Sequence, residues 1–163
     1  MVNSAITMSE RRVELACFEV AGQMVGIDVL HIREIVRNQE TTLLPKAPCL
    51  IEGVIDLRGK VIPVVDLGRA LAKGSCRGAM TARIAIIEID ELVMGLRVDA
   101  AVDVLSVSSG SLESPPALAT HSGYDDVRAV VRRKDAPPVM VLALEEILES
   151  VYRSNPRCGE EAQ

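Results

Sequence analysis

The chain has 163 residues, 48% of them hydrophobic and 2% aromatic, with a formal net charge of −5. This length fits one domain, or two small subdomains that share a core. The acidic balance argues against a nucleic-acid or anionic-membrane surface, because such a surface needs a basic face. The scarcity of aromatic side chains also argues against a single-strand-binding barrel, in which bases stack on aromatic rings. We therefore expect no nucleic-acid partner and a core packed from aliphatic side chains.

The first 70 residues predict four strands and a short helix. Residues 15–28 contain two apolar stretches joined by a tight Ala-Gly-Gln turn, which favours a hairpin. Asp28 is a candidate N-cap for a helix over 29–36, where apolar residues recur at the spacing of one helical face. Residues 53–67, GVIDLRGKVIPVVDL, predict a second hairpin from two β-branched runs. Pro63 cannot donate a ladder hydrogen bond, so we expect it at an edge or a bulge.

The second half of the chain predicts further strands and ends in a helix. Residues 67–74 read as a brief helix or turn that ends at Gly74. Residues 82–107 contain two strands across an Asp-Glu turn and then a third strand. A long loop rich in Ser, Pro and Gly is predicted over 108–126. Residues 127–144 form one more hairpin with a charged tip, and residues 144–153 form an amphipathic helix.

Many short strands at regular spacing are typical of small barrels or of a sandwich. The strands fall into two clusters, one before about residue 68 and one after about residue 82. These clusters predict two paired subdomains in one fold.

The four cysteines are widely spaced and form no C-x-x-C pair. In a chain of this size they are expected to be reduced thiols, mostly buried. The N-terminus has no signal-peptide pattern, and no apolar segment approaches the roughly 20 residues that a membrane-spanning helix needs. We therefore expect a cytoplasmic protein with no segment inserted in a membrane.

Signals of enzyme chemistry are nearly absent from the sequence. It contains no G-x-S-x-G, Walker A, G-x-G-x-x-G or H-E-x-x-H pattern. His31 and His121 have no Cys or carboxylate nearby at ligand spacing, so no metal site is expected. Most of the strand-end aspartates are expected to face solvent or cap turns. With no catalytic, metal or cofactor site predicted, protein–protein contact is the remaining interpretation.

Arg58 lies between the two apolar runs of residues 53–67, and its sequence context allows two interpretations. In the first, Leu57 to Lys60 is an ordinary hairpin turn in which Gly59 supplies the positive φ and Arg58 is hydrated. In the second, Arg58 projects from a rigid hairpin beside apolar surface and binds carbonyls or carboxylates of a partner.

Four stretches resemble, in order and spacing, the CheW family of chemotaxis coupling proteins: GIDVLHIREIV, GVIDLRGKVIPVVDL, LVMGLRVDAAVDVLSV and PPVMVLALEEIL. The resemblance covers residues from about 14 to 150. It implies a mainly β fold of two small five-stranded barrels, SH3- or OB-like, packed over a shared apolar core with a few short helices. The expected domain is 13–152, between a flexible N-terminal tail, 1–12, and a flexible C-terminal tail, 153–163.

The resemblance also implies a non-enzymatic adaptor that joins a CheA-type histidine kinase, at its regulatory domain, to the cytoplasmic tip of a chemoreceptor. It places Arg58 on the receptor-binding surface, and Ile32 and Glu34 near the face that contacts receptor and kinase. Asp56 stands where the family more often has Asn, so we count it with the partner-binding residues. Two alternatives stay open. One is a scaffold of a divergent pathway that controls surface motility, pili or a second messenger, and the other is a ligand- or nucleic-acid-binding barrel.

Overall fold

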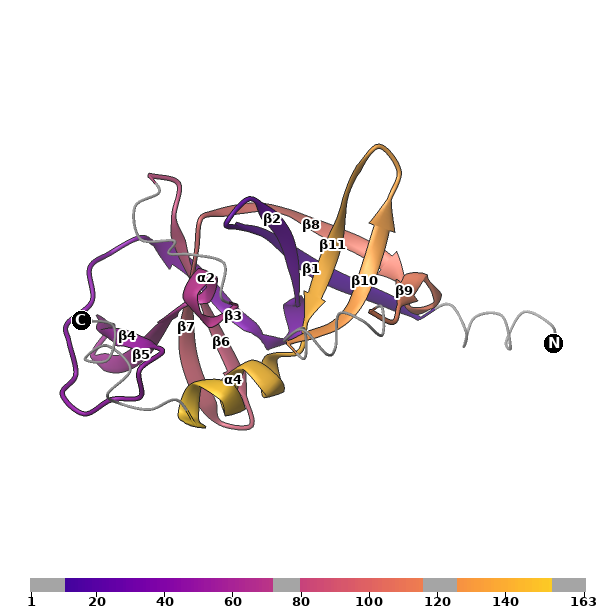
Figure 1. Cartoon of the computed structure of the whole chain (residues 1–163). Coiled ribbons are helices and arrows are strands. Elements are labelled where there is room, and N and C mark those ends of the chain that lie inside the picture. Colours follow the sequence, from indigo (N-terminus) through magenta and orange to yellow (C-terminus); the bar gives the residue numbers. More distant parts are fainter. Residues whose placement is uncertain (1–10, 72–79, 116–125, 154–163) are drawn as a thin grey trace.

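The computed structural model describes residues 11–71, 80–115 and 126–153, which fold mainly into two mixed β-sheets (Figure 1). Sheet A has six strands in the order β8-β1-β2-β11-β10-β9, and sheet B has five in the order β3-β6-β7-β5-β4. The strands of sheet A are β1 (Arg12–Val20), β2 (Gln23–Asp28), β8 (Ala100–Ser108), β9 (Leu112–Glu113), β10 (Val127–Arg133) and β11 (Ala136–Leu142). Those of sheet B are β3 (Ile32–Arg37), β4 (Ile51–Leu57), β5 (Lys60–Asp66), β6 (Arg83–Ile89) and β7 (Leu92–Val98).

The mainly β prediction and its four hairpins are confirmed, but the strands are distributed differently from the prediction. Sheet B takes β3 to β7 from the middle of the chain, and sheet A takes the strands at both ends. The division into clusters before 68 and after 82 is therefore wrong. The sequence clusters fail because β11, near the C-terminus, pairs in parallel with β2, near the N-terminus, so that Met140 stands opposite Val25. Sheet A also has one strand more than expected, because the two-residue β9 pairs with β10.

The helices are short, and the described residues contain four of them: the 3-10 turns η1 (Val29–His31) and η2 (Ser109–Ser111), and the α-helices α2 (Leu67–Ala70) and α4 (Leu144–Arg153). The brief helix after residue 66 and the C-terminal helix are confirmed. Gly74, the expected end of the former, lies outside the described residues, as does much of the predicted long loop over 108–126.

The predicted helix over 29–36 is wrong beyond its first turn. Asp28 does act as an N-cap, since its Oδ1 accepts a hydrogen bond of 3.0 Å from the Leu30 amide. The chain then becomes β3, in which half-buried and exposed residues alternate, and it pairs with β6. β-Branched side chains favour this pleated surface over a helix. The pairing register shifts between Ile32 and Glu34, so Ile32 packs against the shared core while Val36 packs against the interior of sheet B. The apolar spacing of Val29, Ile32 and Val36 therefore imitated a helical stripe without lying on one face.

The buried apolar side chains form three groups, one between the two sheets and one inside each sheet. Alternation along the strands separates them, because successive side chains point to opposite faces. On β6, Ile84 and Ile86 point into the interior of sheet B, whereas Ala85 and Ile87 point into a core between the sheets. On β1, Leu15 and Cys17 point into the interior of sheet A. Each sheet thus has its own interior, and both contribute to a shared core.

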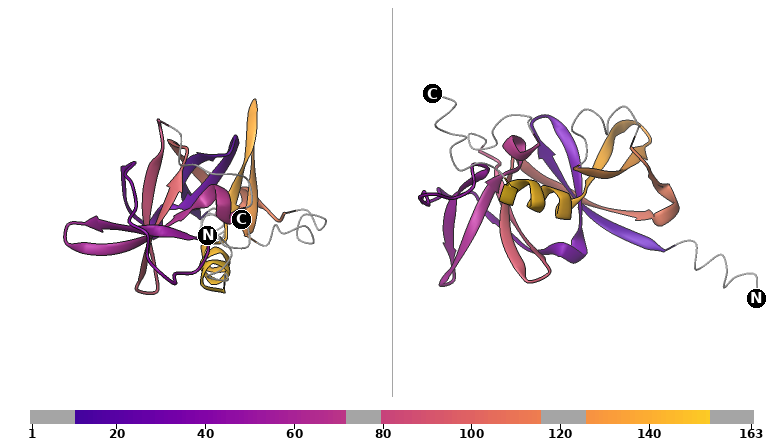
Figure 2. Two further views of the ribbon diagram at one scale, coloured as in Figure 1. Left: turned by 60° about the vertical axis from the view of Figure 1, so that its left-hand side comes forward. Right: turned by 60° about the horizontal axis from the view of Figure 1, so that its bottom comes forward.

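Helix α4 closes the shared core at the junction of the two sheets (Figure 2). Its buried residues Leu144, Ile147, Leu148 and Val151 recur at the spacing of one helical face. They pack with β1 and β2 of sheet A and with β6 and β7 of sheet B. The expected architecture of two small β units over one apolar core is therefore confirmed.

Sheet B rolls until its two edge strands approach each other, and this joint is the seam of the sheet. Arg58, in the turn directly after edge strand β4, forms an ion pair with Glu34 on the opposite edge strand β3. Farther along, Thr42 and Val54 exchange backbone hydrogen bonds of 2.8 and 2.9 Å. A Cβ on Gly53 would lie 2.6 Å from the Thr42 carbonyl oxygen, so this close approach requires glycine.

Pro63 lies in an inner strand, but the pairing of β5 with β7 begins one residue later, at Val64. Pro63 therefore stands opposite Val54 of β4 alone, which fits the expectation of an edge-like position.

The expected domain limits of 13 and 152 fall close to the ends of the described structure. β1 begins at Arg12 and α4 ends at Arg153. Residues 1–10 and 154–163 lie outside the described residues, so the predicted tails remain a prediction. The expectation of four reduced thiols is wrong for Cys49, which is disulfide-bonded. Cys17 is a free, buried thiol.

Candidate protein-binding surface

The turn between β4 and β5 presents Arg58 on a well-defined backbone. Leu57 pairs with Lys60, so Arg58 and Gly59 form a two-residue hairpin turn with φ angles of 53° and 84°. Two positive φ angles are the mark of a type I′ turn. The Asp56 Oδ1 accepts a hydrogen bond of 2.9 Å from the Gly59 amide, and this bond stabilises the turn.

Asp56 is thereby given a structural role that does not depend on a partner. An Asx-type bond of this kind is made by Asp and Asn alike, so the departure from the usual Asn leaves the turn intact. Positive φ is not special to Arg58, because Ala21, Asp90 and Glu91 adopt it at other hairpins. What distinguishes Arg58 is its side chain.

The Arg58 guanidinium forms an ion pair with Glu34 across the seam of sheet B. The Arg58 side chain is 70% exposed and the Glu34 side chain 33% exposed. An exposed pair contributes at most about 1 kcal/mol to folding, because water screens both charges. The contact therefore orients Arg58 more than it stabilises the fold. It also brings two of the predicted site residues together.

A hollow of about 210 Å³ opens beside this ion pair, and we call it the seam hollow. Its apolar lining comes from both sides of the seam, and its rim carries charged side chains. The lining residues are Arg33, Glu34, Leu57, Arg58, Lys60, Val61, Ile62, Ile86 and Val93. An apolar floor with a charged rim is the usual composition of a protein-binding hot spot.

Ile32 does not join this surface. It is half-buried and packs against the shared core between the sheets. Ile32 was predicted to bind a partner, but it does not line the surface that Arg58 and Glu34 form. Ile32 anchors the start of β3, and Glu34 lies on the same strand.

Sequence reasoning overlooked Lys60 and Val61 as parts of the site. Val61 is 69% exposed, although its neighbour Ile62 is buried. The pairing of Val61 with Asp56 carries the missing signal, because directly opposed residues of a hairpin share a face. Once Asp56 is placed on the outer face, Val61 must lie there too.

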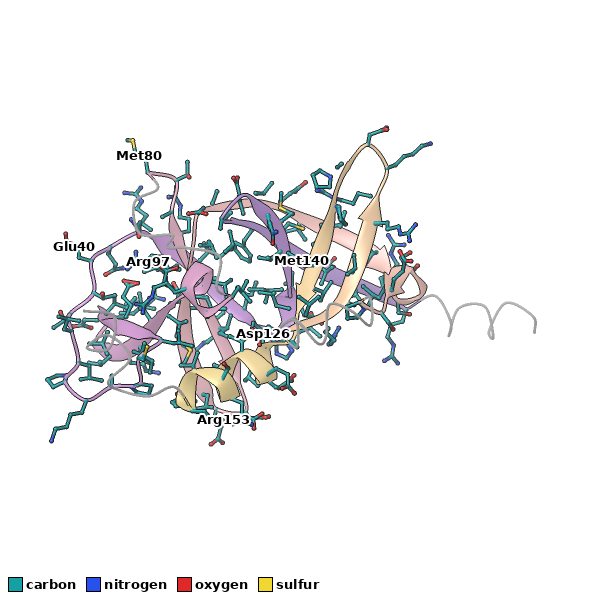
Figure 3. The ribbon with its side chains drawn as sticks, viewed as in Figure 1. Glu40, Met80, Arg97, Asp126, Met140 and Arg153 are labelled. Atoms are coloured by element: carbon teal, nitrogen blue, oxygen red, sulfur yellow. The ribbon has the colours of Figure 1, made fainter. Side chains whose placement is uncertain are left out.

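A buried arginine fixes the chain that follows β3. Arg97 on β7 is 3% exposed and binds Glu52 through two hydrogen bonds, of 2.9 Å from Nε and 2.8 Å from Nη2. The same guanidinium also binds the Asn38 side chain and, at 2.9 Å, the Gln39 carbonyl oxygen. Arg97 points toward the loop that carries Glu40 (Figure 3). The loop is thus held against sheet B from within.

A second exposed apolar strip lies on the edge strand of sheet A. Val102 is 50% exposed and Val104 57% exposed, and both belong to β8. Val104 stands opposite the buried Ala16 of β1, so this strip borders the shared core. Exposed apolar side chains gathered on one edge strand are unusual on a lone protein.

Metal and membrane chemistry are not indicated in the described parts of the chain. Within 11–71, 80–115 and 126–153, no group of three or more His, Cys, Asp or Glu side chains could hold a metal ion. His31 ends the η1 turn, and His121 lies outside the described residues. No helix in these same ranges is long and apolar enough to cross a membrane.

Known proteins resemble this chain over most of its length. Residues 14–152 match the family model described as CheW-like domain. The chain is 32% identical over 157 residues to a chemotaxis protein CheW of Rhizobium meliloti, covering 96% of this chain and 98% of the relative. It is 35% identical over 103 residues to a CheW of Bacillus subtilis, covering 63% and 66%. It is also 31% identical over 103 residues to the protein FrzA of Myxococcus xanthus, covering 63% and 64%.

The fold has a solved counterpart. The crystal structure of the scaffolding protein TtCheW from Thermoanaerobacter tengcongensis superimposes with a TM-score of 0.74 at 31% sequence identity. The match covers 84% of this chain and 88% of that one. The family model spans most of the chain, and the TtCheW structure shares its overall fold. The chain therefore belongs to the CheW family of scaffold and adaptor proteins with a CheW-like domain.

Proposed function

We propose that this protein is a non-enzymatic adaptor that couples the cytoplasmic tip of a chemoreceptor to a CheA-type histidine kinase. The observation that carries the proposal is the arrangement around Arg58. Its guanidinium is exposed, oriented by Glu34 and set beside an apolar hollow. Membership of the CheW family supports a chemoreceptor and a histidine kinase as the partners. We also propose that this protein acts in the cytoplasm.

An adaptor needs two surfaces that different partners can occupy at once. The seam hollow lies on sheet B, and the Val102–Val104 strip lies on the edge of sheet A. The shared core and the closing helix α4 join the two sheets. Such a body transmits free energy only through contacts that differ between the signalling states of its partners. We assign Arg58 to the receptor-binding surface, with Glu34 orienting it.

The experiment uses Arg58→Asn and a purified cytoplasmic fragment of the cognate receptor. Asn tolerates positive φ better than Arg does, so the turn is expected to keep its full stability. Loss of the exposed guanidinium is expected to weaken receptor binding by about ten-fold or more. Isothermal titration calorimetry measures the affinity, and urea denaturation measures the stability.

The matched control is Lys134→Asn, at the tip of the β10–β11 hairpin, which removes one cation far from the seam. It is expected to leave receptor affinity within about two-fold of wild type. Equal affinity of Arg58→Asn and wild type for the receptor fragment would reject the role of Arg58.

A further inference from the structure

We propose that the seam hollow is an anchor pocket that receives one apolar side chain of the chemoreceptor tip, while Lys60 binds a carboxylate beside that side chain. The inference rests on the proposed function and adds the chemistry by which the partner is recognised. The partner segment it describes carries an aromatic or branched aliphatic residue next to Asp or Glu.

The floor of the hollow is the interior of sheet B itself. Ile62 and Ile86 are buried members of that interior, and Leu57 and Val93 pack against it. The seam leaves this interior accessible at the Arg58 end. At the level of Gly95 the same interior is full, because a Cβ there would lie 2.7 Å from the Ile84 Cγ2. The space is therefore local to the mouth of the hollow.

The size of the hollow fits a side chain better than a metabolite. Its volume is about 210 Å³. A cavity of about 150 Å³ lined by apolar side chains already accepts benzene. Binding sites for drug-sized molecules begin at about 300 Å³. One phenyl ring or one branched aliphatic group is the occupant that this volume suits.

Leaving an apolar interior open at one end is unfavourable for folding, since protein cores are otherwise close-packed. A larger residue than Val93 or Val61 at the mouth would fill the space. Departures from good packing of this kind concentrate at functional sites. The small valines keep the hollow accessible to another protein.

The charges on the rim of the hollow determine which residue of the partner can lie next to its apolar anchor. Arg33 is engaged by Glu88 at 3.2 Å, and Arg58 is engaged by Glu34. Lys60 lines the hollow and has no ion-pair partner in the part of the chain that the structure describes. Its ammonium is therefore a rim cation that can bind a partner's carboxylate without giving up an existing ion pair.

The test measures the Kd of the receptor cytoplasmic fragment for wild type and for matched pairs of variants. Val93→Phe fills the hollow, and Leu92→Phe is its control, because it places the same ring on the opposite face of β7. Lys60→Glu reverses the rim charge, and Lys134→Glu reverses a distant charge. Val93→Phe and Lys60→Glu are expected to raise the Kd about ten-fold or more, while both controls stay within about two-fold of wild type. Thermal unfolding of each variant shows that it is folded.

The possible outcomes separate this inference from the proposed function. If wild type binds the fragment and folded Val93→Phe binds equally well, the anchor pocket is rejected and the adaptor function stands. If Lys60→Glu binds as tightly as Lys134→Glu, the carboxylate contact is rejected, and this result does not depend on whether Val93→Phe folds. If wild type itself fails to bind the fragment, the proposed function falls, and this inference falls with it.

Discussion

The buried pair of Arg97 and Glu52 gives the most quantitative prediction for the fold. The Arg97 and Glu52 side chains are 3% and 4% exposed and joined by two hydrogen bonds, of 2.9 and 2.8 Å. Arg97→Met removes the cation but leaves the Glu52 carboxylate in the interior. Breaking one partner of such a pair costs about 3–5 kcal/mol, because the remaining carboxylate stays buried without the guanidinium that faces it. The variant also loses the bonds that hold the loop at Asn38 and Gln39.

For a protein of this length, each kcal/mol lowers Tm by about 2–4 °C, so we expect Arg97→Met to melt about 6–20 °C below wild type. Urea denaturation followed by circular dichroism gives the free energy of unfolding. The double variant Arg97→Met/Glu52→Leu removes both charges and is expected to regain much of the loss, because an apolar replacement of a buried pair is often neutral.

The exposed pair of Arg33 and Glu88 provides the control. Arg33→Ala should change the free energy of unfolding by less than about 1 kcal/mol, since water screens that pair. The reasoning is refuted if Arg97→Met is as mild as Arg33→Ala. It is also refuted if the double variant is no more stable than the single one.

Two further predictions concern the interiors of the two sheets. Gly95→Ala should destabilise by about 1–3 kcal/mol, because its Cβ would lie 2.7 Å from the Ile84 Cγ2 and 3.3 Å from the Val64 Cγ2. Gly110→Ala, with no atom within 4 Å of the added Cβ, should stay within about 0.5 kcal/mol in the same urea titration, and equal effects would contradict the packing argument. Burial raises the pKa of the Cys17 thiol above its ordinary value of 9.0, so iodoacetamide at pH 8 should label Cys17 slowly until urea is added. The native thiol holds its proton longer than the unfolded one, so its contribution to stability is complete below pH 9.0 and is lost as pH rises through the native pKa. Wild type should therefore lose stability above pH 9.0 more steeply than Cys17→Ala, and identical slopes would argue against the burial effect.

Local pattern predicted most of the strands because β-branched runs and turn residues act over a few positions. The same reasoning failed at 29–36, where the spacing of the apolar residues imitated a helical stripe although Ile32 and Val36 pack into different cores. It could not assign strands to sheets, because the pairing of β11 with β2 joins segments more than 100 residues apart.

In the candidate site, too, local features could be predicted from the sequence and long-range contacts could not. The hairpin turn at Arg58 and Gly59 could be derived from the sequence, and the family resemblance added Glu34. The ion pair between Arg58 and Glu34 depends on the rolling of sheet B. Arg97 is a stronger case, because arginine in a strand is usually exposed and its partner Glu52 lies 45 positions away. Ile32, which the resemblance also added, packs against the shared core, and its role in partner binding stays a prediction.

The adaptor role is tested most directly by reconstitution of the purified protein with its cognate kinase and receptor fragment. Autophosphorylation of the kinase is measured with the receptor fragment present, with and without this protein. We predict that wild type makes kinase activity depend on the receptor, and that folded Arg58→Asn removes most of this dependence. Kinase activity that responds equally to the receptor in the absence of the protein, or that is unchanged by Arg58→Asn, would contradict the account.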